Sequence, residues 1–154
     1  MIAIRPMRDK DADAMHEVHT KAVRRACAPL LDPDVVDAWL FGRTPGGYVS
    51  AAADGGERFW VGVIDAERVV GFASWRDDEL ISLFVDPDCH GRGIGRRLFD
   101  ACQDDAAANG NGIVRLNSTL NARTFYEAYG FREVGRGYNE KRHKRIPHIE
   151  MVRG

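Results

Sequence analysis

The chain has 154 residues, a formal net charge of −1 and 44% hydrophobic residues. This length suits one domain with a substantial core, and the composition argues against disorder and against general nucleic-acid binding. Three cysteines lack a paired or metal-like spacing, which favours a reducing compartment, and no apolar run approaches the ~18 residues that span a membrane. We therefore expect a single cytoplasmic domain over residues 1–154, without a signal peptide.

The first third of the chain predicts one short strand and two helices. Ile2 and Ile4 alternate as a strand that ends at Pro6. Apolar residues recur at helical spacing from Asp11 to about Arg25. Asp32-Pro33-Asp34 is typical of a helix start. Residues 42–56 hold six glycines and prolines and predict a loop, in which only residues 51–53 are open to helix.

The remaining elements alternate between strands and helices. A hairpin is expected from residues 59–64 and 69–75, and the almost wholly apolar run 80–85 predicts a strand covered on both faces. A strand–helix–strand crossover at 80–116 should be parallel. The fold class is therefore α/β, with a mixed sheet. The later elements are a helix from Ile94, a strand at 113–116, a helix at 122–129 and two C-terminal strands, the last at about 146–152.

The stretch from Leu80 to Leu98 is the most informative part of the chain. Glycines stand at positions 91, 93 and 95 between the apolar strand and an amphipathic helix, where they let the backbone bend and a ligand approach it. The unpaired N–H groups at the start of that helix form an anion site, and nearby arginines add positive charge. A phosphate-bearing ligand is expected. The dinucleotide and Walker loops are excluded, because Arg96 and Arg97 stand where those loops need other residues.

Two motifs together give this chain a family resemblance. His90-Gly91-Arg92-Gly93-Ile94-Gly95, within residues 80–98, resembles motif A of the GNAT superfamily of acyl-CoA-dependent N-acetyltransferases, usually written Gln/Arg-x-x-Gly-x-Gly/Ala. Residues 117–131, with Asn121-Ala122 and Phe125-Tyr126-Glu127 before Gly130-Phe131, resemble motif B of the same superfamily. His90 departs from the Gln or Arg that is usual at the first position of motif A.

The resemblance implies a particular architecture and co-substrate. The GNAT fold is a largely antiparallel sheet with a central parallel strand pair, flanked by helices. Its parallel strands, here 80–85 and 113–118, splay apart, and the pantetheine arm of coenzyme A lies in the gap. Acetyl-CoA is therefore the expected co-substrate, and no metal is expected. The implied cofactor-binding residues are Phe84, Val85, Arg92, Gly93, Ile94, Gly95, Arg96 and Asn121.

These residues have distinct expected roles. N–H groups from Arg92 to Arg96 would bind the pyrophosphate. The backbone of Phe84 and Val85 would pair with the pantetheine like an added strand, and the Phe84 N–H would polarise the acyl carbonyl. Asn121 matches the motif B amide that reaches the cofactor in the family.

Two residues are candidates for proton transfer. Tyr126 matches the tyrosine that commonly stands near the sulfur, and a phenol with a pKa near 10 can protonate a departing thiolate. Glu79 opens the motif A strand, where many GNAT enzymes carry a carboxylate, and is the candidate general base. Asp77, Asp78, His148 and water remain alternatives.

The expected function is transfer of an acetyl group from acetyl-CoA to a primary amine of a small molecule, by direct attack in a ternary complex. The alternatives are acetylation of a protein N-terminus or lysine, and a non-catalytic acyl-CoA sensor. The partners are acetyl-CoA and the amine, with neither nucleic acid nor membrane, and a homodimer stays open. The basic run 141–145 predicts a solvated loop. Trp39 and Tyr48 are the candidates for an acceptor wall.

Overall fold

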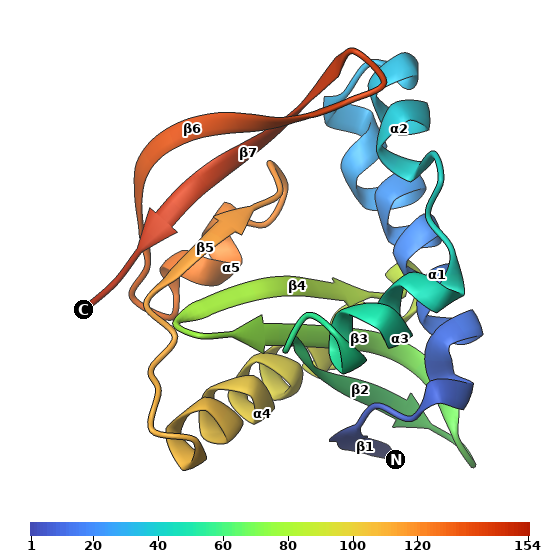
Figure 1. The fold of residues 1–154 in the computed structure, drawn as a ribbon, viewed down its shortest axis with the longest axis vertical. Helices are drawn as coiled ribbons and strands as arrows, with labels where there is room; N and C mark the ends of the chain where they lie inside the picture. Colours follow the sequence, from blue (N-terminus) through green and yellow to red (C-terminus); the bar gives the residue numbers. More distant parts are fainter.

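The computed structural model describes residues 1–154 as one seven-stranded mixed sheet with helices on both faces (Figure 1). The strand order is β1-β2-β3-β4-β5-β7-β6, and only β4 and β5 run parallel. The predicted mixed α/β fold is thus confirmed. The strands are β1 (Ile2–Pro6), β2 (Arg58–Ile64), β3 (Arg68–Arg76), β4 (Glu79–Val85), β5 (Arg115–Ser118), β6 (Arg132–Lys141) and β7 (Lys144–Val152). The helices are α1 (Ala12–Ala22), α2 (Pro33–Leu40), α3 (Pro45–Ala53), α4 (Ile94–Ala108) and α5 (Arg123–Glu127).

Each face of the sheet has its own hydrophobic core. On one face α4 packs along the strands, with Ile94, Leu98 and Cys102 fully buried at helical spacing. On the other face α1 and α3 cover the sheet through Met15, Tyr48 and neighbouring side chains. Since strand side chains alternate between faces, β4 contributes to both cores. The sheet therefore separates an α4 side from an α1 side.

The parallel strand pair separates after only two residue pairs. Glu79 lies opposite Arg115, and Leu80 lies opposite Leu116. Beyond that point β5 pairs only with β7, so one edge of β4 from Ile81 onward has no strand partner. Ile81 is also an extra residue in β4, because Ser74 pairs with Ser82 whereas Trp75 pairs with Leu80. The predicted splay between these strands is confirmed.

Residues 42–56 are more helical than the sequence predicted. Helix α3 begins at Pro45, after Thr44 in an extended conformation, and it extends to Ala53. Proline at the first helical position suits a helix start. Tyr48 is buried and packs edge-on against Phe72, with ring centroids 5.4 Å apart. This packing outweighs the low helix propensity of the two glycines that follow Pro45.

The other boundaries differ by one or two residues from the predictions. The strand expected at 113–116 is β5 and begins at Arg115, and the helix expected at 122–129 is α5, over Arg123–Glu127. Helix α1 continues into a single π-helical turn at Val23–Cys27. None of the helices combines the length and the apolar character that crossing a bilayer requires.

The basic run forms the end of the β6–β7 hairpin, which we call the hairpin tip (residues 141–144) and which reaches across to α2 (Figure 1). Arg142 and His143 form its two-residue turn with positive φ angles. The Lys141 Nζ donates a hydrogen bond to the Trp39 carbonyl oxygen at 2.9 Å, and the Arg142 guanidinium lies 3.8 Å from the centre of the Phe41 ring. The run is solvent-exposed from Arg142 to Arg145, as predicted, but it forms two strand ends and a tight turn rather than a loop.

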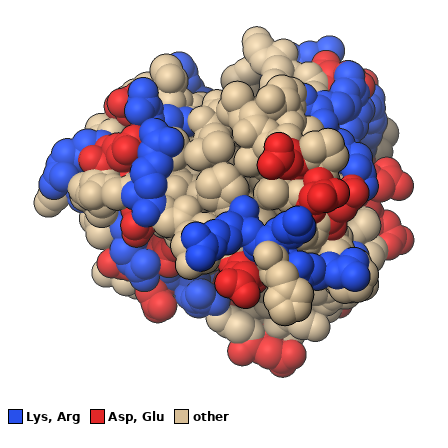
Figure 2. All heavy atoms as spheres, turned by 90° about the horizontal axis from the view of Figure 1, so that it is seen from above, with Lys and Arg blue, Asp and Glu red and all other residues tan.

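The end of the molecule that carries the hairpin tip and α2 has no uniform charge. Figure 2 shows lysines, arginines and acidic residues interspersed around an uncharged area on this face. Lys144 lies 3.8 Å from the Asp34 carboxylate at the start of α2. The tip thus attaches to α2 and to Phe41, the residue after it, through one hydrogen bond from a lysine side chain to a carbonyl oxygen, one cation–π contact and one ion pair.

Candidate functional site

The first of two cavities lies at the N-terminus of α4 and has a volume of about 490 Å³. We call it the α4 cavity. Gly91 and Gly93 have φ angles of +83° and +76°, and a Cβ atom on either would meet nothing within 4 Å. Left-handed backbone of this kind favours glycine, and the open space admits a ligand close to the chain. Gly93 caps α4, whose first N–H groups point toward this space with no partner inside the helix.

The α4 cavity brings together most of the predicted cofactor residues. Phe84, Val85, Gly93, Ile94, Gly95, Arg96 and Asn121 line it, whereas Arg92 does not. The Asn121 Oδ1 accepts a hydrogen bond from the Cys27 thiol at 3.4 Å, which leaves the NH₂ group of the amide free for a ligand. His90 lies in the same lining, and so does Cys27 of the π-helical turn.

The hydrogen-bonding phase of β4 decides which amides face the gap. The Asp86 N–H donates to the Val70 oxygen of β3 at 2.8 Å. Along an antiparallel strand, successive residues direct their N–H groups alternately toward and away from the partner strand. With Phe84 opposite Phe72 in the same register, the Phe84 N–H also faces β3. The amides of Leu83 and Val85 therefore face the unpartnered edge. The Phe84 N–H, predicted to polarise the acyl carbonyl, therefore does not face the gap, and the Leu83 N–H faces it instead.

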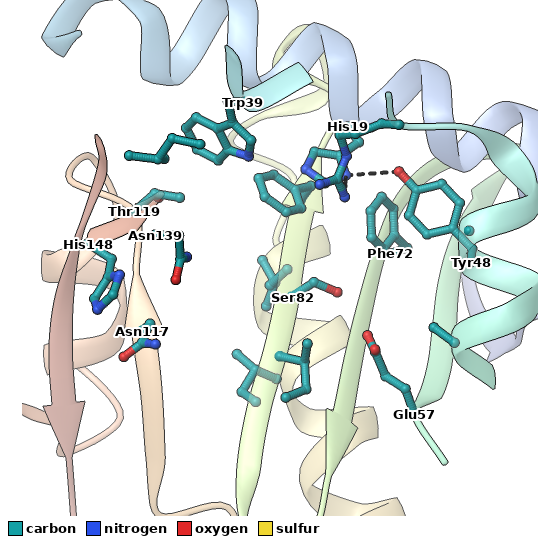
Figure 3. Close-up of a pocket in the computed structure, with 18 of the residues that line it drawn as sticks. His19, Trp39, Tyr48, Glu57, Phe72, Ser82, Asn117, Thr119, Asn139 and His148 are labelled. Atoms are coloured by element: carbon teal, nitrogen blue, oxygen red, sulfur yellow. Dashed lines mark hydrogen bonds between the residues drawn. The ribbon is translucent and has the colours of Figure 1, made fainter. Parts of the chain in front are cut away.

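The second cavity lies on the α1 side of the sheet and has a volume of about 730 Å³ (Figure 3). We call it the α1 cavity. Its lining includes Trp39 of α2 and Tyr48 of α3, the two candidates for an acceptor wall. Asn117 and His148 on β5 and β7 face Ser82 on β4 across the space (Figure 3). The hairpin tip contributes Lys141.

His19 is a buried member of the α1 cavity lining that sequence reasoning missed. The Arg43 guanidinium donates to its Nδ1 at 2.9 Å, and the Tyr48 hydroxyl lies 2.8 Å from the same atom (Figure 3). Its ring stacks on Phe84 with centroids 4.0 Å apart. Burial and the nearby Arg43 charge hold the pKa of His19 well below 6.5, so the imidazole is neutral at pH 7.

A chain of hydrogen bonds connects a carboxylate to the α1 cavity. The Ser74 hydroxyl donates to Glu57 Oε2 at 2.5 Å, and its oxygen lies 2.6 Å from the Ser82 hydroxyl oxygen. Ser74 is fully buried, whereas Glu57 and Ser82 both line the cavity. Burial raises the pKa of Glu57 above 4.5. The only feature of the sequence that could have indicated this chain of hydrogen bonds is the pair of serines inside largely apolar strands.

The predicted base candidates divide into two groups. Glu79 and His148 line the α1 cavity, whereas Asp77 and Asp78 do not. The Glu79 carboxylate lies 2.8 Å from the Arg115 guanidinium, which also lies 2.7 Å from Asp78. Glu79 therefore enters the cavity already paired with a cation.

Tyr126 stands where the two cavities meet. Four residues line both cavities: Leu83, Phe84, Thr119 and Tyr126. Burial raises the pKa of the Tyr126 phenol well above 10, so the hydroxyl stays protonated at neutral pH. A hydroxyl group and the edge amide of Leu83 thus lie at a junction that both cavities reach.

Comparison with known families places the chain among the acetyltransferases. The acetyltransferase (GNAT) domain matches residues 47–153, which is most of the chain. The chain therefore belongs to the GNAT family, as its two motifs predicted.

Two curated relatives support this assignment. The chain is 30% identical over 93 residues to the peptidyl-lysine N-acetyltransferase YjaB of Salmonella typhimurium, over 60% of this chain and 63% of YjaB. The match thus spans less than two thirds of that relative. It is 31% identical over 139 residues to the uncharacterized N-acetyltransferase MJ1530 of Methanocaldococcus jannaschii, over 84% of this chain and 78% of that protein.

Solved structures confirm the GNAT fold. A GCN5-related N-acetyltransferase from Rhodopseudomonas palustris superposes with a TM-score of 0.87 at 21% identity, over 98% of this chain and 94% of that one. The PaiA N-acetyltransferase of Thermoplasma acidophilum, solved in complex with coenzyme A, gives 0.74 at 17% identity, over 100% and 99% of the two chains. At such identities the likeness concerns the fold alone.

Proposed function

We propose that this chain transfers the acetyl group of acetyl-CoA to a primary amine, by direct attack in a ternary complex. The observation that carries the proposal is the junction of the two cavities at Leu83, Phe84, Thr119 and Tyr126. A thioester and an amine can meet only where both ligands reach the same point. Holding them together contributes several kcal/mol, since effective molarities reach roughly 10⁵–10⁸ M.

The α4 cavity has the chemistry that coenzyme A requires. A pyrophosphate is an anion, and the open glycine turn presents the N–H groups at the start of α4 to it. The pantetheine arm contains amides, and Leu83 and Val85 offer the unpaired edge of β4 for strand-like pairing. When bound, acetyl-CoA supplies the activated acyl group. Arg92 does not line the cavity, and in this proposal it contributes to pyrophosphate binding through its charge.

The junction residues have two roles in the proposed reaction. The Leu83 N–H, at the edge of β4, polarises the acyl carbonyl. The Tyr126 hydroxyl donates its proton to the sulfur as the C–S bond breaks, and it regains a proton from the newly acylated nitrogen. Since the phenol stays protonated at neutral pH, it is ready to act as the acid.

The amine must lose one proton before it attacks. Ser74 donates to Glu57, so its oxygen accepts from the Ser82 hydroxyl, and the Ser82 oxygen is left to accept from an ammonium group in the cavity. A proton then passes from the amine to Ser82 Oγ, from Ser82 to Ser74, and from Ser74 to Glu57. Glu79 is the competing acceptor. Its carboxylate is already engaged by the Arg115 guanidinium at 2.8 Å, whereas Glu57 is linked to the cavity through the two serines.

The proposed acceptor is a small molecule. Its support is the wall that the hairpin tip and α2 build together, through Lys141 and the Trp39 carbonyl, along a cavity of small-ligand size. A peptidyl lysine is the second candidate, because YjaB is named for that activity. The three buried, free cysteines agree with the cytoplasm as the compartment.

One assay tests the proposal. The protein is incubated with acetyl-CoA and a panel of amines, a lysine-containing peptide and an N-terminal peptide, and release of free thiol is followed. We expect amine-dependent thiol release that is fastest with a small amine. Binding of acetyl-CoA in calorimetry without thiol release from any amine would instead identify an acyl-CoA sensor.

A further inference from the structure

The charged residues of the α1 cavity are arranged unevenly. Arg43 and Lys141 lie by α1, α2 and the hairpin tip, where their hydrogen-bond partners are neutral. Glu57 and Glu79 lie by the Ser74–Ser82 pair, with Arg76 and Arg115 beside them. Glu140, also in the lining, is solvent-exposed. The cavity thus has a cationic end, where Arg43 and Lys141 have no carboxylate partner, and a mixed end, where the carboxylates lie beside arginines.

At the cationic end, hydrogen-bond donors outnumber acceptors. Because a guanidinium can only donate, Arg43 fixes His19 Nδ1 as an acceptor, and the neutral ring then carries its proton on Nε2. That Nε2 atom is buried without a hydrogen-bond partner, and so is Arg43 Nε. Buried donors without acceptors are uncommon in folded proteins. Both atoms are shielded from the cavity, so an anionic group would bind the remaining N–H groups of the Arg43 guanidinium, at Nη1 and Nη2, which are not among these buried atoms.

Lys141 adds a second cation from a distant part of the chain. Its ammonium is bound to the Trp39 carbonyl oxygen, which uses one of its three donors. Partial burial and, after it, repulsion from the charge of Arg43 lower the pKa of Lys141. The two cations thus repel each other in the cavity. This repulsion costs stability unless an anion lies between them.

The cationic end also adjoins the proposed reaction centre. His19, which Arg43 contacts, stacks on Phe84 at 4.0 Å, and Phe84 lines both cavities. An acidic group held by Arg43 would thus lie within the length of a small molecule from the junction. The amine of the same molecule could then reach Ser82, two residues before Phe84 on the same face of β4.

We propose that the acceptor is a small amine that carries an anionic group, carboxylate or phosphonate-like, which Arg43 and Lys141 bind while its amine faces Ser82. This inference rests on the proposed N-acetyltransferase function and names its substrate class. The shared chemistry is an acid oxygen group at one end and an amine at the other. Charge-assisted hydrogen bonds from two cations would select such a molecule over a neutral analogue.

The test uses acceptors in matched sets. Each set contains a free amino acid, its carboxamide and the corresponding aminophosphonate, with a lysine peptide as a further arm, and kcat/KM is measured with saturating acetyl-CoA. We expect a roughly 10- to 100-fold preference for the acids over the carboxamide. The two acid arms distinguish carboxylate from phosphonate recognition.

Substitutions of the two cations test whether they cause the preference for acids over carboxamides. Arg43→Gln and Lys141→Gln should each raise KM for the acid while changing the carboxamide little, and Lys144→Gln is the control. Lys144 belongs to the same hairpin tip and loses the same charge, but it does not line the cavity. Since Arg43→Gln also removes a partner of His19, Lys141→Gln keeps the test valid if the first variant fails to fold.

Two failures can be told apart. If amines are acetylated but the carboxamides or the lysine peptide match the acids, the anionic subsite is wrong and the acetyltransferase stands. If no amine supports thiol release, the proposed function itself is wrong.

Discussion

Gly137 of β6 lies directly opposite His148 of β7, and a Cβ atom on Gly137 would come within 2.8 Å of the His148 Nε2 atom. The His148 imidazole thus occupies space that a side chain at position 137 would fill. The relationship fixes where a polar wall residue of the α1 cavity sits.

We predict that Gly137→Ala displaces the His148 ring and raises KM for the acceptor several-fold, while the dissociation constant for acetyl-CoA stays unchanged. Steady-state kinetics and calorimetry measure the two quantities. Gly135→Ala is the matched control, because its Cβ would meet only the end of the flexible Glu150 side chain. Equal effects of the two variants would show that His148 placement does not matter.

Glu57→Gln should lower kcat by roughly 10²–10⁴-fold at pH 7, because the relay loses its final proton acceptor. Much of the rate should return at high pH, where the amine is already neutral. Because burial raises the pKa of Glu57, the acid limb of the pH–rate profile of the unmodified protein should lie above pH 4.5. Ser82→Ala should reproduce the loss.

Glu79→Gln separates the two carboxylates. If Glu57 accepts the proton, this variant keeps the shape of the pH–rate profile and its high-pH plateau. A profile in which Glu79→Gln, and not Glu57→Gln, removes the acid limb would restore Glu79 as the base.

Tyr126→Phe should reduce kcat and kcat/KM by the same factor, roughly 10²–10⁴, as expected for an interaction made in the transition state. Packing should be preserved, because Phe99, Phe125 and Phe131 surround the ring and the hydroxyl alone is removed. Normal turnover would make Tyr126 structural. Loss of acetyl-CoA affinity in proportion to activity would make it a cofactor contact.

Gly95→Asp should weaken acetyl-CoA binding sharply, because it places a negative charge at the pyrophosphate site. Gly95→Ala is the control for added bulk. A Cβ atom there would meet Phe125 at 3.5 Å and Leu83 at 3.7 Å, which are ordinary contacts, so both variants should fold. Unchanged affinity of the aspartate variant in calorimetry would refute the anion site at α4.

Asp105 provides a stability prediction outside the site. It accepts hydrogen bonds from Arg58, Trp60 and Trp75, and these, Arg58 above all, lower the pKa of its carboxyl from 3.8 to about 2. A carboxyl whose pKa is lower in the folded than in the unfolded protein stabilises the fold at pH values above its unfolded pKa. This stabilisation is lost as the pH falls from about 4 to 2. Asp105→Asn should therefore cost roughly 2 kcal/mol at pH 7 and much less near pH 2. Denaturant unfolding at both pH values measures this, and a cost independent of pH would contradict it.

The sequence predicted the parts of the site that local chemistry determines. The glycine turn, the start of α4 and Tyr126 lie where the two motifs indicated, because each depends on a short run of residues. The hairpin and the apolar strand β4 also follow from local patterns. The splay came from the family resemblance.

The rest depends on contacts between distant segments. Glu57, Ser74 and Ser82 come together only when β2, β3 and β4 are in register. Arg43 and Lys141 line one cavity only because the hairpin tip reaches α2. The choice of Leu83 over Phe84 depends on the register of β4 with β3, which no sequence pattern fixes. Packing of Tyr48 similarly produced a helix where glycines predicted a loop.

The attachment of the hairpin tip to α2 has a consequence for how such a protein diversifies. The two segments that wall the acceptor side, residues 39–48 and 139–148, lie outside the glycine turn and the edge of β4. Lengthening the tip or exchanging it together with α2 would therefore reshape the proposed acceptor side and leave the proposed acetyl-CoA site unchanged. A library confined to these two segments is a rational starting point for directing the protein toward new amines.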